Sequence, residues 1–160
     1  MSRQWAGLWG GLILAWLAAP ALGATDLPAA VDLRAEAAQA AKAGAPLIVI
    51  YSRQECKYCE AVKRDYLKPL AANPRFRDRV LIRQINQDGD EQALTDFKGV
   101  VSTHARVATA EKVKLVPVVA FYGPDGRQLA YPIVGARLPD FYQSYLEDAV
   151  EQSARALKKP

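Results

Sequence analysis

The chain has 160 residues and a formal net charge of +4, from 21 Lys and Arg against 17 Asp and Glu. This length predicts one domain plus an N-terminal segment, and such a domain buries an ordinary core without disulfide staples. The basic residues are interspersed with other types, as in Arg75 to Arg79, and form no sustained run with aromatic residues between them. The composition therefore argues against a nucleic-acid-binding protein and favours a solvated, mildly basic surface.

Residues 1–23 have the layout of a secretory signal peptide. Arg3 supplies a positive start, and Leu8 to Ala19 is an uncharged stretch rich in Leu, Ile, Trp and Ala. Pro20 breaks this run, and the small residues after it suit cleavage. The stretch without charged residues runs from Gln4 to Thr25 and approaches the length of a membrane span, so an uncleaved anchor is the alternative. We expect an exported protein in which residues 24–30 are a linker.

After the linker the sequence predicts a helix and then a buried strand. Val31 to Ala43 is rich in helix formers, with Asp32 as N-cap and Gly44 as the stop. Leu47 to Tyr51 is a short, continuous apolar run rich in β-branched residues. Such a run is typical of a strand that is buried on both faces of a sheet.

A second helix is predicted from Cys56 to Lys68, after a polar loop. One face carries apolar residues at helical spacing: Val62, Tyr66 and Leu70. We expect the basic residues of this helix to lie largely outside: Lys63, Arg64 and Lys68. Because proline lacks an N–H and clashes with the preceding turn, we expect Pro69 to end or kink the helix.

The middle of the chain predicts a second strand, Val80 to Asp88, with Leu81 and Ile85 among its core residues. Gly89 to Gly99 is polar and turn-like. Three of its apolar residues are spaced for a helical turn: Ala93, Leu94 and Phe97. Thr103 to Lys114 predicts another helix, so the strands of this region are separated by helical segments.

The last third predicts a strand, a tight turn, a strand and a helix. Val118 to Tyr122 is the third strand, Gly123 to Gly126 has hairpin turn chemistry, and Arg127 to Gly135 returns as the fourth strand. The final helix opens at Leu138 to Asp140. Its apolar stripe has five members: Tyr142, Leu146, Ala149, Val150 and Leu157.

The predicted fold is α/β, with a central mixed four-stranded sheet flanked by helices. The first two strands are separated by a helix, which predicts a parallel pair with a crossover. The last two are joined by a tight turn, which predicts an antiparallel pair. We expect helices on both faces of the sheet.

Cys56 and Cys59 are the two cysteines of the chain. A bridge that closes so short a loop removes little entropy from the unfolded chain, so the pair would be a weak staple. A structural zinc site needs four ligands, and the sequence offers this pair and His104, which we expect to be a solvated loop residue rather than a ligand or a base. A C-x-x-C after a buried strand is instead typical of a redox centre.

The predicted helix start suggests how the two thiols divide the work. Unsatisfied N–H groups and the positive end of the helix dipole favour a thiolate at Cys56. Cys59, one turn further on, can attack a mixed disulfide formed at Cys56. We therefore predict Cys56 as the nucleophile and Cys59 as the resolving thiol. Lys57 supports a thiolate, Glu55 opposes it, and together with Tyr58 these neighbours modulate the pKa and the potential of the pair.

These features resemble the thioredoxin superfamily over Val31 to Leu157. The strand Leu47 to Ser52, the C-x-x-C at the next helix start, and Val116-Pro117 before a strand, hairpin and helix carry the resemblance. It is most similar to exported bacterial thioredoxin-like proteins with C-x-Y-C centres, a group that includes SoxW-type thioredoxins and the catalytic domains of disulfide isomerases. The resemblance implies a thioredoxin-like domain over residues 31–157, followed by a short tail, residues 158–160.

The resemblance also assigns residues around the cysteines. It implies that Pro117 is a cis-proline opposite them, that Val116 belongs to the segment that binds substrate backbone, and that Gly135 flanks the site. Two positions depart from the family pattern. Glu55 stands where many thioredoxins have Trp, and Ile50 stands where they have a buried acid that helps to deprotonate the resolving thiol. Another group, such as Glu60, Lys57 or water, would then take the proton, unless resolution depends less on a base.

The activity implied is that of a periplasmic thiol–disulfide oxidoreductase. It would be a monomer that acts on protein disulfides or thiols, with the Cys56–Cys59 disulfide in place of a cofactor and with no metal. We favour a reductase over an isomerase or oxidase. Because the periplasm is kept oxidising, a reductase implies a membrane electron donor of the DsbD kind. The alternatives from another class are a non-catalytic binding module and a copper carrier using the two thiolates.

Overall fold

The computed structural model describes residues 27–137 and 139–158. The predicted signal peptide, residues 1–23, the start of the linker and the last two residues of the predicted tail lie outside the described residues. In the part that is described, none of the helices has the length and apolar character needed to span a membrane.

The central sheet has four strands in the order β2-β1-β5-β6. Its strands are β1 (Leu47–Ser52), β2 (Leu81–Asn86), β5 (Val118–Tyr122) and β6 (Ile133–Val134). β1 pairs in parallel with β2 and antiparallel with β5, and β5 pairs antiparallel with β6. The predicted mixed sheet, with its parallel first pair and antiparallel last pair, is therefore confirmed.

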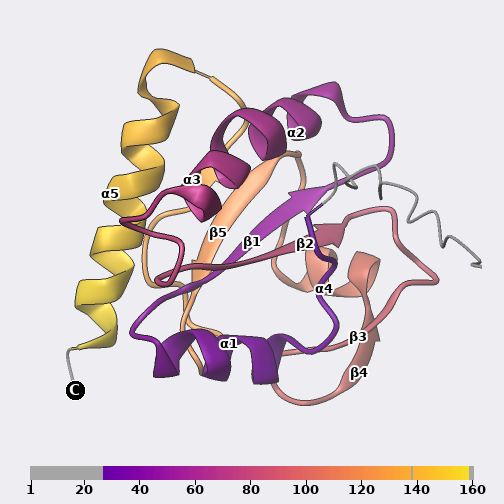
Figure 1. Ribbon diagram of the computed structural model, residues 1–160. Coiled ribbons are helices and arrows are strands. Elements are labelled where there is room, and N and C mark those ends of the chain that lie inside the picture. Colours follow the sequence, from indigo (N-terminus) through magenta and orange to yellow (C-terminus); the bar gives the residue numbers. More distant parts are fainter. Residues whose placement is uncertain (1–26, 138, 159–160) are drawn as a thin grey trace, which may run out of the picture.

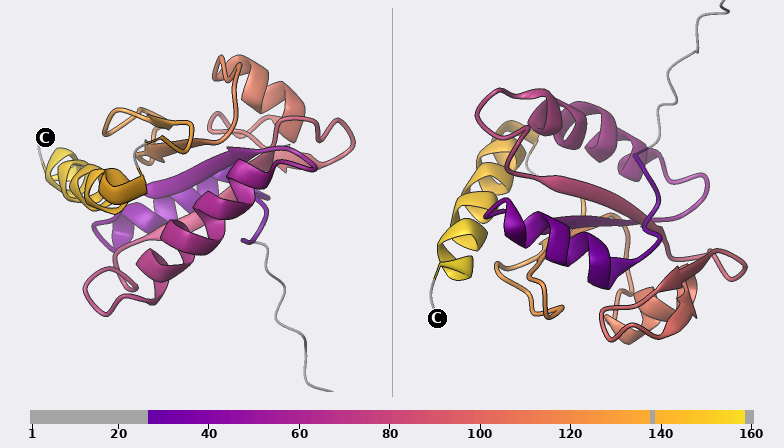
Figure 2. Two further views of the ribbon diagram at one scale, coloured as in Figure 1. Left: turned by 90° about the horizontal axis from the view of Figure 1, so that it is seen from above. Right: turned by 60° about the horizontal axis from the view of Figure 1, so that its bottom comes forward.

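Helices cover both faces of this sheet (Figure 1). One face packs on α1 (Leu33–Lys42) and α4 (His104–Ala110), and the other on α2 (Lys57–Val62), α3 (Lys68–Ala72) and α5 (Pro139–Leu157). Figure 2 shows α5 and α4 on opposite sides of the molecule.

Every residue of β1 is buried, as its apolar run predicts. Val49 and Tyr51 join the core beneath α1 and α4, whereas Ile48 and Ile50 join the core beneath α2, α3 and α5. This alternation of side chains between the two faces is the reason that the strand must be apolar throughout.

The helix that follows the cysteines does not end at Pro69, so of the two expected effects of this proline, an end or a kink, the first is not observed. A π-helical segment, η1 (Lys63–Leu67), separates α2 from α3, and the helix continues to Ala72. The N–H of Lys68 bonds to the carbonyl of Lys63, five residues back. The wider π turn lets the chain pass a proline that lacks a donor and would crowd a regular α-helical turn.

The predicted helical turn within Gly89–Gly99 is also wrong, because two short strands form a hairpin there. These strands are β3 (Ala93–Thr95) and β4 (Val101–Thr103). The Asp96 carboxylate accepts the N–H groups of Lys98 and Val100 at 2.8 and 2.9 Å. This side-chain turn reverses the chain locally, and apolar spacing alone could not reveal it.

The predicted fourth strand, Arg127 to Gly135, is mostly irregular, and only Ile133 and Val134 form β6. Nearer the turn, Gln128 makes one isolated bridge to Tyr122. Pro132 has no N–H to donate to a ladder, which limits the strand on its N-terminal side.

His104 is buried at the start of α4, with 2% of its surface exposed, so the expectation of a solvated loop residue is wrong. Its Nδ1 accepts the backbone N–H of Asn86 at 3.0 Å, and its Nε2 lies 2.9 Å from the carbonyl oxygen of Ala30. The ring therefore ties α4 to β2 and to the segment that enters the domain. Because Nδ1 accepts, the proton of the neutral ring lies on Nε2 and is donated to Ala30.

This burial predicts a pH dependence of stability. Burial lowers the pKa of His104 below its ordinary value of 6.5. The unfolded chain therefore takes up a proton that the folded protein resists, and stability falls as the pH drops through about 6.5 towards the folded pKa. We expect the free energy of unfolding, measured in urea at a series of pH values, to fall less steeply over this range in His104→Gln. Parallel profiles for the two proteins would show that another group carries the effect.

Candidate active site

Cys56 and Cys59 lie at the start of α2, after the loop that follows β1. Cys56 is the N-cap of α2, and its sulfur accepts the backbone N–H of Cys59 at 3.2 Å. The two sulfur atoms are joined in a disulfide bond, with the Cα atoms 5.2 Å apart. The predicted place of the pair, after a buried strand and at a helix start, is confirmed.

The two sulfur-bearing residues differ in exposure. Cys56 has 7% of its surface exposed and Cys59 has none. A partner that approaches the disulfide therefore meets Cys56 first, while Cys59 lies behind it in the core. This asymmetry is what sequential attack by two thiols requires.

A groove of about 290 Å³ lies beside the turn that holds this disulfide. It is lined by Tyr58, Val116, Pro117, Gly135, Ala136 and Arg137. The Val116–Pro117 peptide bond is cis, and the N–H of Gly135 donates to the Pro117 carbonyl at 2.8 Å. Because Tyr58 lies between the cysteines in the chain, the groove joins the C-x-x-C turn to the segment at Pro117.

The structure therefore brings together four residues that the sequence singled out, namely Tyr58, Val116, Pro117 and Gly135. Ala136 and Arg137 also line the groove and were missed. The sequence gives only a weak indication that these two residues line the groove, namely that they directly follow Gly135. Arg137 places a cationic side chain beside the groove, although the resemblance draws no attention to it.

Glu55 and Lys57, the charged neighbours of Cys56, are both exposed. Glu55 has a φ of +54°, in the left-handed region that non-glycine residues rarely occupy. Such strain is common next to functional groups, where the surrounding structure holds the backbone in place. Here it turns the chain from the loop after β1 into the cysteine turn.

Lys63 is buried, although the sequence places it on the outer side of the helix. Its Nζ lies 2.6 Å from Oε1 of Glu60 and 3.0 Å from Oε1 of Gln84 on β2. The sequence signal for the burial of Lys63 was its position four residues after Cys59, because residues four apart lie on the same face of a helix. A lysine in a run of charged residues is more often solvated, and the sequence alone favours that interpretation.

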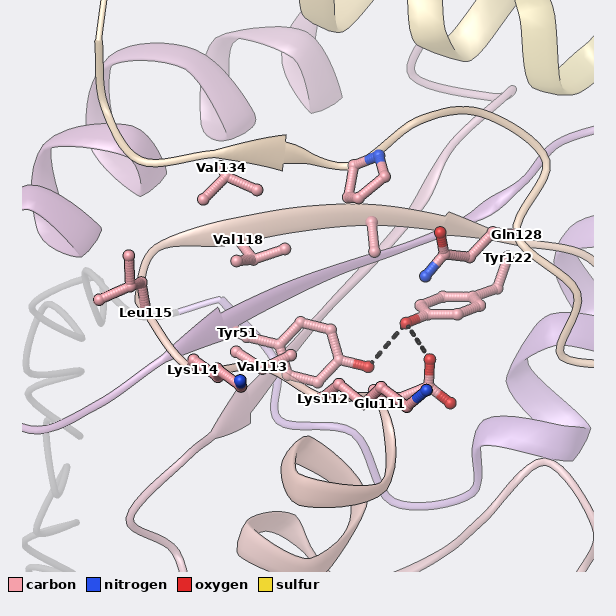
Figure 3. A pocket seen from close by; sticks show the side chains of 12 residues that line it. Tyr51, Glu111, Lys112, Val113, Lys114, Leu115, Val118, Tyr122, Gln128 and Val134 are labelled. Carbon is pink, nitrogen blue, oxygen red and sulfur yellow. Dashed lines mark hydrogen bonds between the residues drawn. The ribbon is translucent and has the colours of Figure 1, made fainter.

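A second hollow, of about 240 Å³, lies on the face covered by α1 and α4 (Figure 3). Tyr51 and Tyr122 meet there through their hydroxyl groups at 2.8 Å, and the Tyr122 hydroxyl donates to Glu111 at 3.0 Å. Burial raises the pKa of both tyrosines above their ordinary value. Both therefore stay neutral at physiological pH. This chain of hydrogen bonds holds α4 against the sheet, on the face opposite α2.

Within residues 27–137 and 139–158, no cluster of three or more His, Cys, Asp or Glu side chains is placed to hold a metal ion. Both ring nitrogens of His104 are engaged by the backbone. The chemistry that this arrangement supports is thus thiol–disulfide exchange at Cys56 and Cys59, next to a groove that can receive a chain segment.

Comparison with known proteins agrees with this geometry. Residues 33–150 match the family model of the thioredoxin-like domain. Among solved structures, mitochondrial thioredoxin 3 from Saccharomyces cerevisiae, in its oxidised form, is 15% identical with a TM-score of 0.51, over 78% of this chain and 93% of that one. Thioredoxin O2 from Arabidopsis thaliana is 17% identical with a TM-score of 0.48, over 74% and 91%.

At such low identity the structural likeness supports the fold alone. Among curated protein sequences, none matches the chain. The family match covers most of the chain, and the predicted C-x-x-C forms the expected disulfide within it. The chain therefore belongs to the family of thioredoxin-like domains, and its Cys56–Cys59 pair makes it a thiol–disulfide oxidoreductase.

Proposed function

We propose that this oxidoreductase is an exported, periplasmic reductase of protein disulfides. The observation that carries the proposal is the asymmetry of the pair: Cys56 is slightly exposed on the turn whose Tyr58 lines a groove, whereas Cys59 is fully buried. An incoming disulfide can reach only the first sulfur. The apolar, uncharged N-terminal stretch supports export.

In the proposed reaction the reduced protein gives two electrons to its substrate. The Cys56 thiolate attacks one sulfur of the substrate disulfide, forms a mixed disulfide and releases the other substrate sulfur as a thiolate. The Cys59 thiolate then attacks the Cys56 sulfur, so that the Cys56–Cys59 bond forms and the second substrate thiolate leaves. Both substrate thiolates take up protons from solvent. The backbone N–H of Cys59, 3.2 Å from the Cys56 sulfur, favours the attacking thiolate.

The partners follow from this direction of electron flow. In an oxidising compartment the disulfide form must be reduced again after each turnover, which requires a membrane electron donor of the DsbD kind. The substrate is a protein segment lying along Val116 and Pro117, and the working form is a monomer. An isomerase or oxidase would use the same groove and the same sulfurs, so the potential of the pair separates these activities.

A redox titration of the pair against glutathione or dithiothreitol buffers tests the proposal. We expect a reduction potential near that of thioredoxin, about −270 mV, rather than near that of DsbA, about −120 mV. We also expect the reduced protein to reduce a disulfide-bonded protein substrate in a single-turnover assay. A potential near the upper value would identify an oxidase and overturn the reductase assignment.

A further inference from the structure

Cys59, the proposed resolving thiol, has no ionisable residue at position 50 of β1, the strand beneath it. The buried charged side chain of Lys63 comes instead from the helical segment that follows Cys59. Ile50 of β1 belongs to the core beneath α2 and cannot ionise or accept a proton. Cys59 is fully buried, so solvent does not stabilise a thiolate there directly. Burial in apolar surroundings favours the neutral thiol. A resolving thiolate at this position needs a compensating group.

Lys63 is placed to be that group. It follows Cys59 by one helical turn, and its backbone N–H donates to the Cys59 carbonyl. Side chains in a helix lean towards its N-terminus, so the side chain of Lys63 extends back towards the turn that holds Cys59. Its Nζ contacts Glu60 in that turn and Gln84 on β2. Gln84 is the register partner of Ile50, so the ammonium lies beside the strand position that carries no charge.

The two charges of this ion pair act unequally on the interior. The side chain of Lys63 is 2% exposed, whereas that of Glu60 is 48% exposed. Water screens the half-exposed carboxylate strongly, but it screens the buried ammonium much less. The field at a buried neighbour is therefore dominated by the cation. A nearby cation favours the charged form of a thiol.

We propose that Lys63 stabilises the thiolate of Cys59 and so promotes resolution of the mixed disulfide. This inference rests on the proposed order of attack at Cys56 and Cys59. In the step concerned, the Cys59 thiol releases its proton to solvent, its sulfur bonds to the Cys56 sulfur, and the bond from Cys56 to the substrate breaks. The substrate sulfur leaves with the electron pair and is protonated by solvent. Lys63 is a positioning residue, acting through Cys59.

Other ionisable groups near this pair come from several elements. Arg64 and Asp65 on η1 form their own exposed ion pair, and Tyr66 follows them. On β2, Gln84 donates to Asn86, and neither of these residues ionises. Beyond Asn86 lies His104 of α4, whose pKa is lowered by burial. Lys63 is thus the buried cation nearest in sequence to Cys59 on its helix.

The test measures the ionisation of the Cys59 thiol in a protein that lacks the other thiol. In the Cys56→Ser protein the ultraviolet absorbance of the thiolate is followed against pH. Adding Lys63→Met should raise the midpoint of this titration by about one pH unit. Lys63→Arg should retain most of the effect, and Glu60→Gln should shift the midpoint the opposite way, to lower pH. Lys98→Met, at an exposed position in the turn between β3 and β4, removes the same charge and should leave the midpoint unchanged.

The same substitution should slow resolution. With Cys56 in a mixed disulfide and Cys59 present, Lys63→Met should release substrate about threefold more slowly at neutral pH. The thiolate fraction falls about tenfold for each unit of midpoint, while the nucleophilicity of the remaining thiolate rises about threefold. An unchanged midpoint in Lys63→Met, or one that rises in Glu60→Gln, would overturn the inference. The titration needs no substrate. It can therefore succeed where the proposed reductase function fails, and fail where that function holds.

Discussion

Cys56→Ser is expected to lose dithiol–disulfide turnover entirely, whereas Cys59→Ser should accumulate mixed disulfides with its substrates. The physical reason is the asymmetry of exposure: the reachable sulfur is needed to form the adduct, and the buried sulfur is needed to release it. Turnover is measured with a disulfide-bonded protein substrate. Adducts are measured by non-reducing electrophoresis and mass spectrometry, before and after dithiothreitol treatment.

The double variant, with Ser at both positions, is the matched control and should form no adduct. If Cys56→Ser formed adducts and Cys59→Ser did not, the two roles would be reversed. If neither single variant changed any redox assay, the disulfide would be passive and the protein would be a binding module built on this fold. The first two outcomes differ in which single variant shows an adduct band on the gel, and the third is recognised by unchanged turnover in both single variants.

Local patterns in the sequence predict the strands and helices whose environment is uniform. β1 and β5 are buried on both faces, and their sequences contain the unbroken apolar runs Leu47 to Tyr51 and Val118 to Tyr122. The N-cap of α1 is confirmed as well, because Asp32 accepts the Ala35 N–H at 2.8 Å. The parallel and antiparallel pairings follow from the lengths of the connections. In each of these cases, residues close together in the sequence determine the local structure.

Two of the misses have a different origin, because they also depend on partners far away in the sequence. The hairpin of β3 and β4 is closed by a side-chain turn and docks beside the entry segment, where Thr95 donates its N–H to Val31 at 2.8 Å. His104 is buried because Asn86 and Ala30 satisfy its ring. No period in the sequence carries such information.

The active site divides in the same way. Cys56 and Cys59 stand out because cysteine is rare in this chain and chemically specific, and Pro117 stands out because of its place directly before a buried strand. Arg137 and Lys63 belong to common types, so only the structure distinguishes them from ordinary surface charges. Lys63 is the clearest case, because its burial depends on a glutamine of the neighbouring strand. Residues that tune a centre are therefore harder to find than residues that react.

A second large effect is expected at the turn between β5 and β6, where Gly126→Ala should destabilise the fold. Gly126 has a φ of +77°, and a Cβ added there would lie 2.7 Å from both Cβ and Cγ of Phe97. The Phe97 ring packs against Tyr122 at 4.7 Å, which limits how far it can move. Left-handed strain and overpacking together predict a loss of about 3 kcal/mol in the free energy of unfolding, measured in urea.

Gly44→Ala separates the two causes. Gly44 has a similar φ of +69°, but an added Cβ would meet nothing within 4 Å. It should therefore cost only the backbone strain, about 1 kcal/mol. If both variants lost the same free energy, Phe97 would have moved aside without cost, and its contact with the turn would not hold the hairpin. A larger loss at Gly126 would show that this ring fixes the turn on Tyr122, and through its hydroxyl on Tyr51 of β1, the strand that leads to the cysteines.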